Sequence, residues 1–335
     1  YLLESDDILF CWSGQPETSI DTFRWQGPSG WLNQHIFKVL PKAELVDRNF
    51  FFHLLRYLKP VFIRIARNKQ TTGLGHVTQG DLKQLMVGLP PIAEQRQLAA
   101  RLDAIEEKIE SNHSLQDGLE SLAHAQFSRL FSTEHDPDGV KVSELIQINP
   151  GRKLTRGVDA TYLGMSALPE FSAEVYNWDT RVFTAGQKFI NGDVLLARIT
   201  PCLENGKTAV VDMLAEGEVG WGSTEFVVLA PTPDYSTSWI YCFVRSEPVR
   251  EFAIRSMTGS SGRQRFQASS LASYKIEQPK ELELAEFGRV AAPIFDKLTQ
   301  IRNENRALGA LRASLNPEIM AGRIRPVIPI PEAVQ

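Results

Sequence analysis

The sequence predicts an α+β fold in which two similar small mixed domains are separated by two long antiparallel helices that form a coiled coil. Two observations predict it: a long-period internal repeat, and two stretches with the apolar spacing of long amphipathic helices. The predicted boundaries are residues 1–91 for the first domain, 92–132 for the first helix, 133–283 for the second domain, 284–322 for the second helix and 323–335 for a tail.

Five blocks in the first 90 residues recur later in the chain at nearly constant spacing. The paired blocks begin at residues 6 and 192, 31 and 221, 51 and 239, 80 and 269, and 90 and 279, so their offsets lie between 186 and 190 residues. Runs of β-branched and aromatic residues within these blocks predict short strands. The first repeat lacks a counterpart of residues 140–189, so we expect its N-terminal part to be truncated.

Apolar residues at spacings of three and four predict a helix over residues 94–131 and a matching helix one repeat later. A helix of about 57 Å, at 1.5 Å per residue, needs a partner to bury its apolar stripe. Asn112 and Asn305 lie on or near this seam, where they either fix the register of the helices or face solvent at its edge. The predicted seam comprises Leu98, Leu102, Ile105, Ile109, Leu119, Leu122, Ile294, Leu298, Ile301, Leu308, Leu311 and Leu315.

The composition is typical of a globular protein, with 43% hydrophobic and 23% charged residues. Cys11, Cys202 and Cys242 form no CxxC pair, so neither a disulfide framework nor a zinc site is predicted, and a reducing cytoplasm is favoured. No apolar run approaches the roughly 18 residues that a membrane-spanning helix needs.

The net charge of −4 argues against a nucleic-acid binder for the chain as a whole, but the charges are segregated. Segment 94–131 carries seven acids and four bases, segment 53–83 six bases and one acid, and segment 245–280 seven bases and three acids. Because salt screens charges beyond roughly 8–10 Å, local charge matters more than the total. A basic segment at the same place in both repeats favours DNA contact over ordinary surface charge.

Each basic segment contains a loop rich in glycine and small polar residues, at 67–76 and 257–266. Arg and Gln can contact base edges, whereas Lys and Thr more often bind phosphates. A second candidate surface follows a strand at 198–207 and has its equivalent at 11–15; for both surfaces a plain surface loop is the alternative. The candidate DNA-binding residues are Lys69, Gln70, Thr71, Thr72, His76, Arg198, Thr200, Lys207, Ser260, Ser261, Arg263, Gln264 and Arg265.

The sequence predicts no catalytic residue and no metal site. Segments 149–152 and 316–318 differ from the Asn-Pro-Pro-aromatic motif of adenine methyltransferases, and the histidines form no HxxxH or HExxH pair. We interpret His113, His124 and His135 as solvated helix and linker residues.

Residues 90–98, Pro-Pro-Ile-Ala-Glu-Gln-Arg-Gln-Leu, resemble the proline and Glu-Gln helix entry that follows each target-recognition domain in the DNA-specificity (S) subunits of type I restriction-modification enzymes. Residues 192–198, Gly-Asp-Val-Leu-Leu-Ala-Arg, resemble the same family. The second helix entry, at 278–284, lacks the Glu-Gln pair. The resemblance covers nearly the whole chain.

The resemblance implies two target-recognition domains that read the halves of a bipartite double-stranded DNA site, with a gap set by the helices. A helix of about 57 Å matches roughly 17 base pairs. The resemblance also implies that the chain is a non-catalytic subunit, which docks two methyltransferase subunits and joins restriction (motor) subunits in the cytoplasm, away from membranes. S-adenosylmethionine, ATP and magnesium belong to those partners, and no cofactor is expected in this chain. The alternatives are a coiled-coil scaffold that never touches DNA and an enzyme in its own right.

Overall fold

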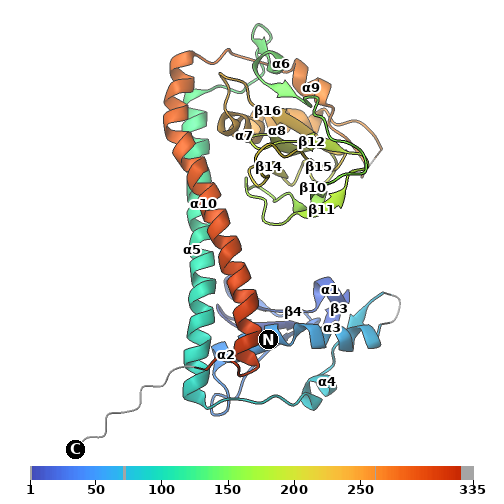
Figure 1. The fold of residues 1–335 in the computed structure, drawn as a ribbon, viewed down its shortest axis with the longest axis vertical. Coiled ribbons are helices and arrows are strands. Elements are labelled where there is room, and N and C mark those ends of the chain that lie inside the picture. Colours follow the sequence, from blue (N-terminus) through green and yellow to red (C-terminus); the bar gives the residue numbers. More distant parts are fainter. Residues whose placement is uncertain (1, 71–72, 261, 326–335) are drawn as a thin grey trace, which may run out of the picture. The chain divides into compact units, whose positions relative to one another are not determined.

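The computed structural model describes residues 2–70, 73–260 and 262–325 and divides into two compact units. Unit 1 contains the described residues up to Glu110 and from Ala307 onward, and unit 2 contains Ser111–Arg306. Each unit combines one α/β domain with a part of both long helices, α5 (Ile92–Leu130) and α10 (Glu281–Met320), which lie side by side in each unit (Figure 1). The predicted fold class is confirmed.

The two long helices run antiparallel. In unit 1, Arg312 donates to both carboxylate oxygens of Glu106 at 2.9 Å. In unit 2, the partners on α5 and α10 are Asn112 with Asn305 and Arg129 with Glu286, so the position on α10 falls as the position on α5 rises.

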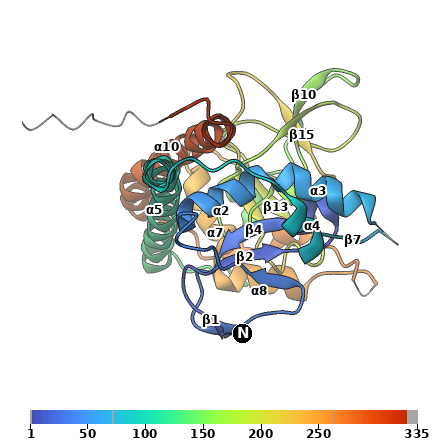
Figure 2. The ribbon, with the colours of Figure 1, turned by 90° about the horizontal axis from the view of Figure 1, so that it is seen from below.

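The domain of unit 1 is a three-stranded antiparallel sheet of order β4-β2-β6, covered on one face by α2 and α3 (Figure 2). Phe10 of β2 meets Phe62 of α3 edge to face, with ring centroids 4.9 Å apart. Two short strand pairs, β1-β5 and β3-β7, flank the sheet. The elements are β1 (Leu2–Leu3), β2 (Ile8–Cys11), β3 (Ser13–Gly14), α1 (Pro16–Ser19), β4 (Asp21–Arg24), β5 (Gly30–Trp31), β6 (Ile36–Lys38), α2 (Arg48–Tyr57), α3 (Lys59–Asn68), β7 (Gly75–His76) and α4 (Gln79–Gln84).

The domain of unit 2 contains two four-stranded sheets, of order β14-β13-β16-β9 and β11-β10-β15-β12, and a strand pair β17-β8. The first sheet is antiparallel, whereas β10 and β15 of the second are parallel. Its elements are β8 (Val140–Lys141), α6 (Val142–Leu145), β9 (Gln147–Ile148), β10 (Asp159–Leu163), η1 (Met165–Ala167), β11 (Asp179–Val182), β12 (Gln187–Phe189), β13 (Val194–Ala197), β14 (Thr208–Val210), β15 (Gly220–Gly222), β16 (Phe226–Ala230), α7 (Thr237–Arg245), α8 (Glu247–Arg255), α9 (Ala268–Ser273) and β17 (Lys275–Ile276).

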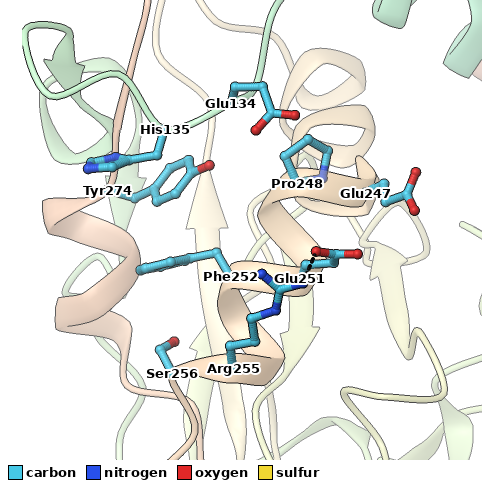
Figure 3. Close-up of a pocket in the computed structure, with 9 residues that line it drawn as sticks. All are labelled: Glu134, His135, Glu247, Pro248, Glu251, Phe252, Arg255, Ser256 and Tyr274. Atoms are coloured by element: carbon cyan, nitrogen blue, oxygen red, sulfur yellow. Dashed lines mark hydrogen bonds and ion pairs between the residues drawn. The ribbon is translucent and has the colours of Figure 1, made fainter.

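Tyr274 links the segment that follows α5 to this domain. The Tyr274 hydroxyl donates to the carbonyl of Thr133 at 2.8 Å, and its ring packs between those of His135 and Phe252 (Figure 3), with centroids 5.3 and 4.5 Å away. His135 itself is exposed, as the sequence interpretation expected.

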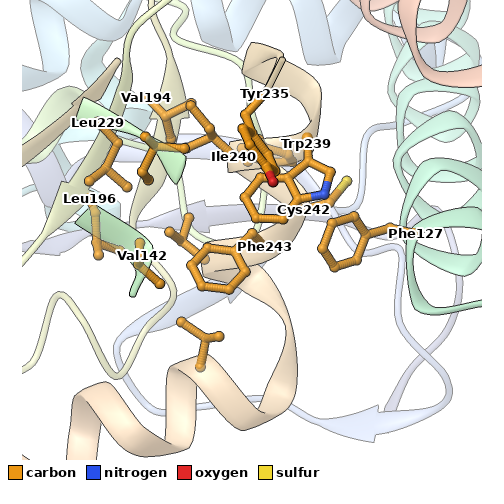
Figure 4. Packing of buried hydrophobic residues seen from close by; sticks show 14 of the residues in the cluster. Phe127, Val142, Val194, Leu196, Leu229, Tyr235, Trp239, Ile240, Cys242 and Phe243 are labelled. Atoms are coloured by element: carbon orange, nitrogen blue, oxygen red, sulfur yellow. The ribbon is translucent and has the colours of Figure 1, made fainter. Parts of the chain in front are cut away.

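Strands β13 and β16 are apolar at every position because both of their faces are covered. One face packs against α7, where the stacked rings of Trp239 and Phe243 lie 5.0 Å apart (Figure 4). Phe127 of α5 packs edge to face on Trp239, at 5.8 Å, and so joins the helix to the same core. The other face packs against a second core that includes Phe189.

The two domains repeat one topology. The central strand β2 lies between β4 and β6, as β13 lies between β14 and β16, and two helices follow in each case. Leu2 pairs with Trp31 as Lys188 pairs with Trp221. Leu2 and Leu3 therefore correspond to Lys188 and Phe189, which the sequence comparison had placed in the stretch without a counterpart.

The prediction of a buried seam position is wrong for two residues. Leu122 is 50% exposed and Leu311 is 45% exposed. The side chains that α5 buries next to Leu122 are those of Ala123 and Phe127, which pack against the domain of unit 2 as well as against α10. The other predicted seam residues are buried or half-buried. Asn112 and Asn305 are both buried, so neither faces solvent.

Candidate nucleic-acid interface

The two candidate surfaces of the second repeat form one surface in unit 2. The backbone of Thr200 donates to the carbonyl of Gln264 at 3.1 Å, and Phe266 donates to the carbonyl of Arg198 at 2.7 Å. The segment after β13 is therefore the neighbour of the segment that closes the basic loop.

The basic loop of unit 2 is closed as a hairpin. Thr258 and Arg265 exchange two backbone hydrogen bonds, of 3.0 and 2.8 Å, and Arg263 donates to the carbonyl of Ser260. Gly259 has φ +128°, a conformation that L side chains rarely adopt, and a Cβ there would lie 2.9 Å from the carbonyl oxygen of Arg263. Ser261 lies outside the described residues.

A carboxylate that the sequence analysis missed lies at the centre of this surface. Glu225 accepts from Nε and Nη2 of Arg265, at 3.0 and 2.9 Å, and from Nε of Arg198 at 3.1 Å. The hydrogen bond from Arg265 is the largest of the interactions that lower the pKa of Glu225 below its usual value. The sequence feature that could have indicated Glu225 is an acidic residue directly before β16, within one of the repeated blocks.

Unit 1 has the same pattern of backbone hydrogen bonds at the equivalent place, and we call this pattern the backbone frame. Trp12 donates to the carbonyl of His35 at 3.4 Å, as Arg198 donates to that of Glu225 at 3.0 Å. Val77 donates to the carbonyl of Trp12 at 2.8 Å, the equivalent of the bond from Phe266. Positions 12, 35 and 76 of unit 1 thus correspond to positions 198, 225 and 265 of unit 2. We call these two sets of three positions the unit 1 triplet and the unit 2 triplet.

The unit 1 frame depends on a close approach of two backbones. A Cβ on Gly75, next to His76 in β7, would lie 2.4 Å from the carbonyl oxygen of Ala66 in α3. His76 pairs with Ser13 of β3, which joins the two candidate surfaces of the first repeat as well. The triplet of unit 1 therefore holds Trp, His and His where unit 2 holds Arg, Glu and Arg.

Several candidate residues already have partners within the chain. Lys69 forms an ion pair with Asp81 at 2.6 Å, the exposed Gln70 donates to the carbonyl of Gly73 at 2.7 Å, and Lys207 donates to that of Met165 at 3.3 Å. Thr71 and Thr72 lie outside the described residues. Thr200 has a buried hydroxyl without a hydrogen-bond partner among the described residues.

The charge sums of the two basic segments overstate the free positive charge. Within the part of the chain that the structure describes, four of the six bases in segment 53–83 and four of the seven in segment 245–280 form ion pairs. Arg263 is exposed and forms no ion pair within residues 2–70, 73–260 and 262–325. The pairs are Arg56–Glu106, Lys59–Asp21, Arg67–Glu17, Lys69–Asp81, Arg245–Glu120, Arg255–Glu251, Arg265–Glu225 and Lys280–Glu283.

Buried polar side chains attach the helices of unit 2 to its domain. Glu120 of α5 accepts from the backbone of Ala173 at 2.9 Å and from the hydroxyl of Tyr241 at 2.6 Å. Arg302 of α10, 2% exposed, lies 3.7 Å from Glu174 and forms an ion pair with Asp212.

The interpretation of two helix histidines as solvated is wrong. His113 lies 3.4 Å from the hydroxyl of Tyr176, with its ring packed on the tyrosine edge to face. His124 packs against Tyr241, and burial, aided by the charge of Arg245, lowers its pKa to about 4. Both face the domain of unit 2 because the helices pack on it there.

Among the described residues, no group of three or more His, Cys, Asp or Glu side chains is placed to hold a metal ion. In the same part of the chain, no helix is both long and apolar enough to cross a membrane. A pocket of about 540 Å³ beside α8 (Figure 3) contains none of the candidate residues.

The sequence profile of the type I restriction modification DNA specificity domain matches residues 1–121, which include the unit 1 triplet. The first 121 residues of the chain are therefore similar to a type I restriction modification DNA specificity domain. The resemblance to type I specificity subunits is thereby confirmed, and the repeated topology places a second domain of the same plan in unit 2.

Proteins similar to this chain include two specificity subunits from Escherichia coli. The chain is 30% identical over 161 residues to that of the type I restriction enzyme EcoEI, covering 44% of this chain and 26% of the relative. It is 30% identical over 141 residues to that of EcoAI, covering 38% of this chain and 23% of the relative. The chain therefore spans about a quarter of the length of these relatives.

The solved S subunit of a type I restriction-modification system from M. genitalium has a similar fold. The TM-score is 0.51 and the sequence identity 16%, over 97% of this chain and 84% of that one. At this identity the likeness concerns the fold alone.

Proposed function

We propose that this chain is a sequence-specific DNA-binding subunit of a type I restriction-modification complex and that it reads a bipartite double-stranded site. One observation carries the proposal: two domains share a backbone frame but present different side chains from it. A shared frame with different triplets is what two domains need if each reads its own half-site.

The unit 2 triplet has the chemistry of a base-reading surface. Arg265 and Arg198 are 41% and 26% exposed, and the neighbouring Arg263 is exposed as well. Guanidinium groups recognise guanine through paired hydrogen bonds in the major groove. In unit 1 the same positions hold Trp12, His35 and His76. These side chains would contact DNA bases in a different way from the arginines of unit 2.

The long helices are the proposed spacer of the complex and the proposed docking surface for two methyltransferase subunits. In this proposal the restriction subunits and all catalysis belong to the partners, so S-adenosylmethionine, ATP and magnesium bind there and not to this chain. The free thiols of Cys11, Cys202 and Cys242 accord with a cytoplasmic location, which is part of the proposal.

Binding titrations test this function directly. The chain, assembled with its methyltransferase subunits, should bind a specific duplex more tightly than a scrambled one. Arg263→Ala or Arg265→Ala should relax the sequence preference in one half-site only, by about 1–3 kcal/mol for each hydrogen-bonded base that the arginine no longer reaches. Arg255→Ala is the matched control, because Arg255 is an exposed arginine of the same unit that lies outside the triplet.

The alternative function, a coiled-coil scaffold that never touches DNA, gives the opposite results. The assembled complex would then show no affinity for any duplex, and complex formation would be insensitive to salt. DNA binding through phosphates instead weakens steeply as salt rises.

A further inference from the structure

We infer that Glu225 is a positioning residue of unit 2, which holds Arg198 and Arg265 so that the outer edges of both guanidinium groups face the DNA. The inference rests on the proposed function and deepens it, because it names what sets the specificity of one half-site.

The carboxylate engages the inner edges of both arginines. Arg265 uses Nε and Nη2 on Glu225, and Arg198 uses Nε. A guanidinium carries five N–H donors, so the Nη groups on the outer edge of each side chain keep donors for a ligand. Contact of Arg265 with DNA through its Nε edge is therefore excluded while the carboxylate is in place.

The backbone that carries this carboxylate is fixed by hydrogen bonds. The backbone nitrogen of Glu225 donates to the hydroxyl of Ser223 at 3.1 Å, and its carbonyl accepts from the backbone of Arg198. The next residue, Phe226, is fully buried and begins β16. The two guanidinium groups are thus tied to a rigid strand instead of moving as long side chains in solvent.

Glu225 also sets the local charge. Two arginines and one carboxylate leave a net charge of +1 in the triplet, and without the carboxylate it would be +2. A second uncompensated arginine would strengthen contact with any phosphate, which carries no sequence information. The carboxylate thus lowers affinity for random DNA while it fixes the reading geometry.

Unit 1 has no carboxylate in this place, because His35 occupies the position of Glu225. His35 lies beside the ring of Trp12, with centroids 5.8 Å apart. The effect of removing Glu225 should therefore be confined to the half-site that unit 2 reads.

The test compares Glu225→Gln with wild type in the full chain assembled with its methyltransferase subunits. The probes are a duplex with the preferred site, duplexes with substitutions in either half-site, and a scrambled duplex. We expect discrimination at one half-site to fall about tenfold, equal to about 1.4 kcal/mol. Affinity for the scrambled duplex should rise, with a salt dependence steeper by about one phosphate contact.

Glu251→Gln is the matched control, because it removes an acid that pairs with Arg255 in α8 of the same unit. It should leave all these quantities unchanged. A double-mutant cycle adds a second readout: Arg265→Ala should cost less discrimination in the Glu225→Gln background than in wild type.

Three results would overturn the inference. If Glu225→Gln keeps full discrimination at both half-sites, or weakens binding to the specific and scrambled duplexes equally, the carboxylate does not position the arginines. In both cases the proposed function survives, because wild type still discriminates. If wild type prefers no duplex, the proposed function fails and the inference fails with it.

Discussion

The side-chain amide of Asn112 donates to Oδ1 of Asn305 across the long helices, at 2.7 Å. The two residues are 2% and 6% exposed, so this is a polar contact within a buried seam. Glu304 accepts a further hydrogen bond from Asn112 at 2.9 Å. Because a buried amide is stabilised only where its partner lies opposite, the pair favours one register of α5 against α10.

Replacing one member of this pair should cost more stability than replacing both. Asn112→Leu leaves the Asn305 amide buried without its partner, which costs about 1–3 kcal/mol. The double variant Asn112→Leu, Asn305→Leu removes both polar groups and should recover most of that loss. Thermal unfolding of the three proteins checks this, and a double variant less stable than the single one would show that the polar contact is not the cause.

Phe127 should contribute far more to stability than Leu122, although the sequence placed Leu122 in the seam. Phe127 is 1% exposed and packs on the rings of Phe131, Trp239 and Phe287. Phe127→Ala should lower the free energy of unfolding by about 3–5 kcal/mol, because it leaves a cavity in the core.

Leu122→Ala is the control for this prediction. Leu122 is half exposed, so its truncation should change the free energy of unfolding by about 0.5 kcal/mol or less. Urea denaturation measures both variants. Equal losses would contradict the burial that distinguishes the two positions.

The seam error has a physical cause. A spacing of three and four identifies the apolar stripe of a helix, but the stripe drifts because an α-helix has 3.6 residues per turn and the heptad assumes 3.5. In unit 2, α5 also packs against the domain, so its buried face includes Gln116 and Glu120. Polar residues buried by distant partners leave no periodic signal in a sequence.

The overall architecture was predictable because each of its signals is local or repeated. The repeat offsets placed the equivalent strands and helices, and the apolar spacing placed both long helices. The joining of the two candidate surfaces was not predictable, since it depends on backbone hydrogen bonds between Arg198 and Phe266, 68 residues apart. For the same reason Glu225 went unnoticed until the fold placed it between two arginines.

Glu174 should make the stability of unit 2 depend on pH. Burial raises its pKa to about 7, from 4.5; Arg302 opposes that shift, and the charge of Glu120 adds to it. Between pH 4.5 and 7 the unfolded chain loses the proton that the folded chain keeps, so stability falls as pH rises through this range. The whole effect amounts to about 3 kcal/mol.

Glu174→Gln should abolish this part of the pH dependence. The measurement is the free energy of unfolding by urea at several pH values for wild type and variant, with Glu251→Gln as an exposed control. The difference between wild type and Glu174→Gln should change steadily up to about pH 7 and then level off. A constant difference across that range would show that Glu174 is ionised in the folded protein throughout.

Selection from a library of random duplexes tests the central claim most directly, because it assumes no sequence in advance. The chain, assembled with its methyltransferase subunits, is mixed with the library and the bound duplexes are sequenced. Our account predicts two short motifs at one fixed spacing, of which Arg263→Ala alters only one. A single contiguous motif, or no enrichment at all, would contradict it.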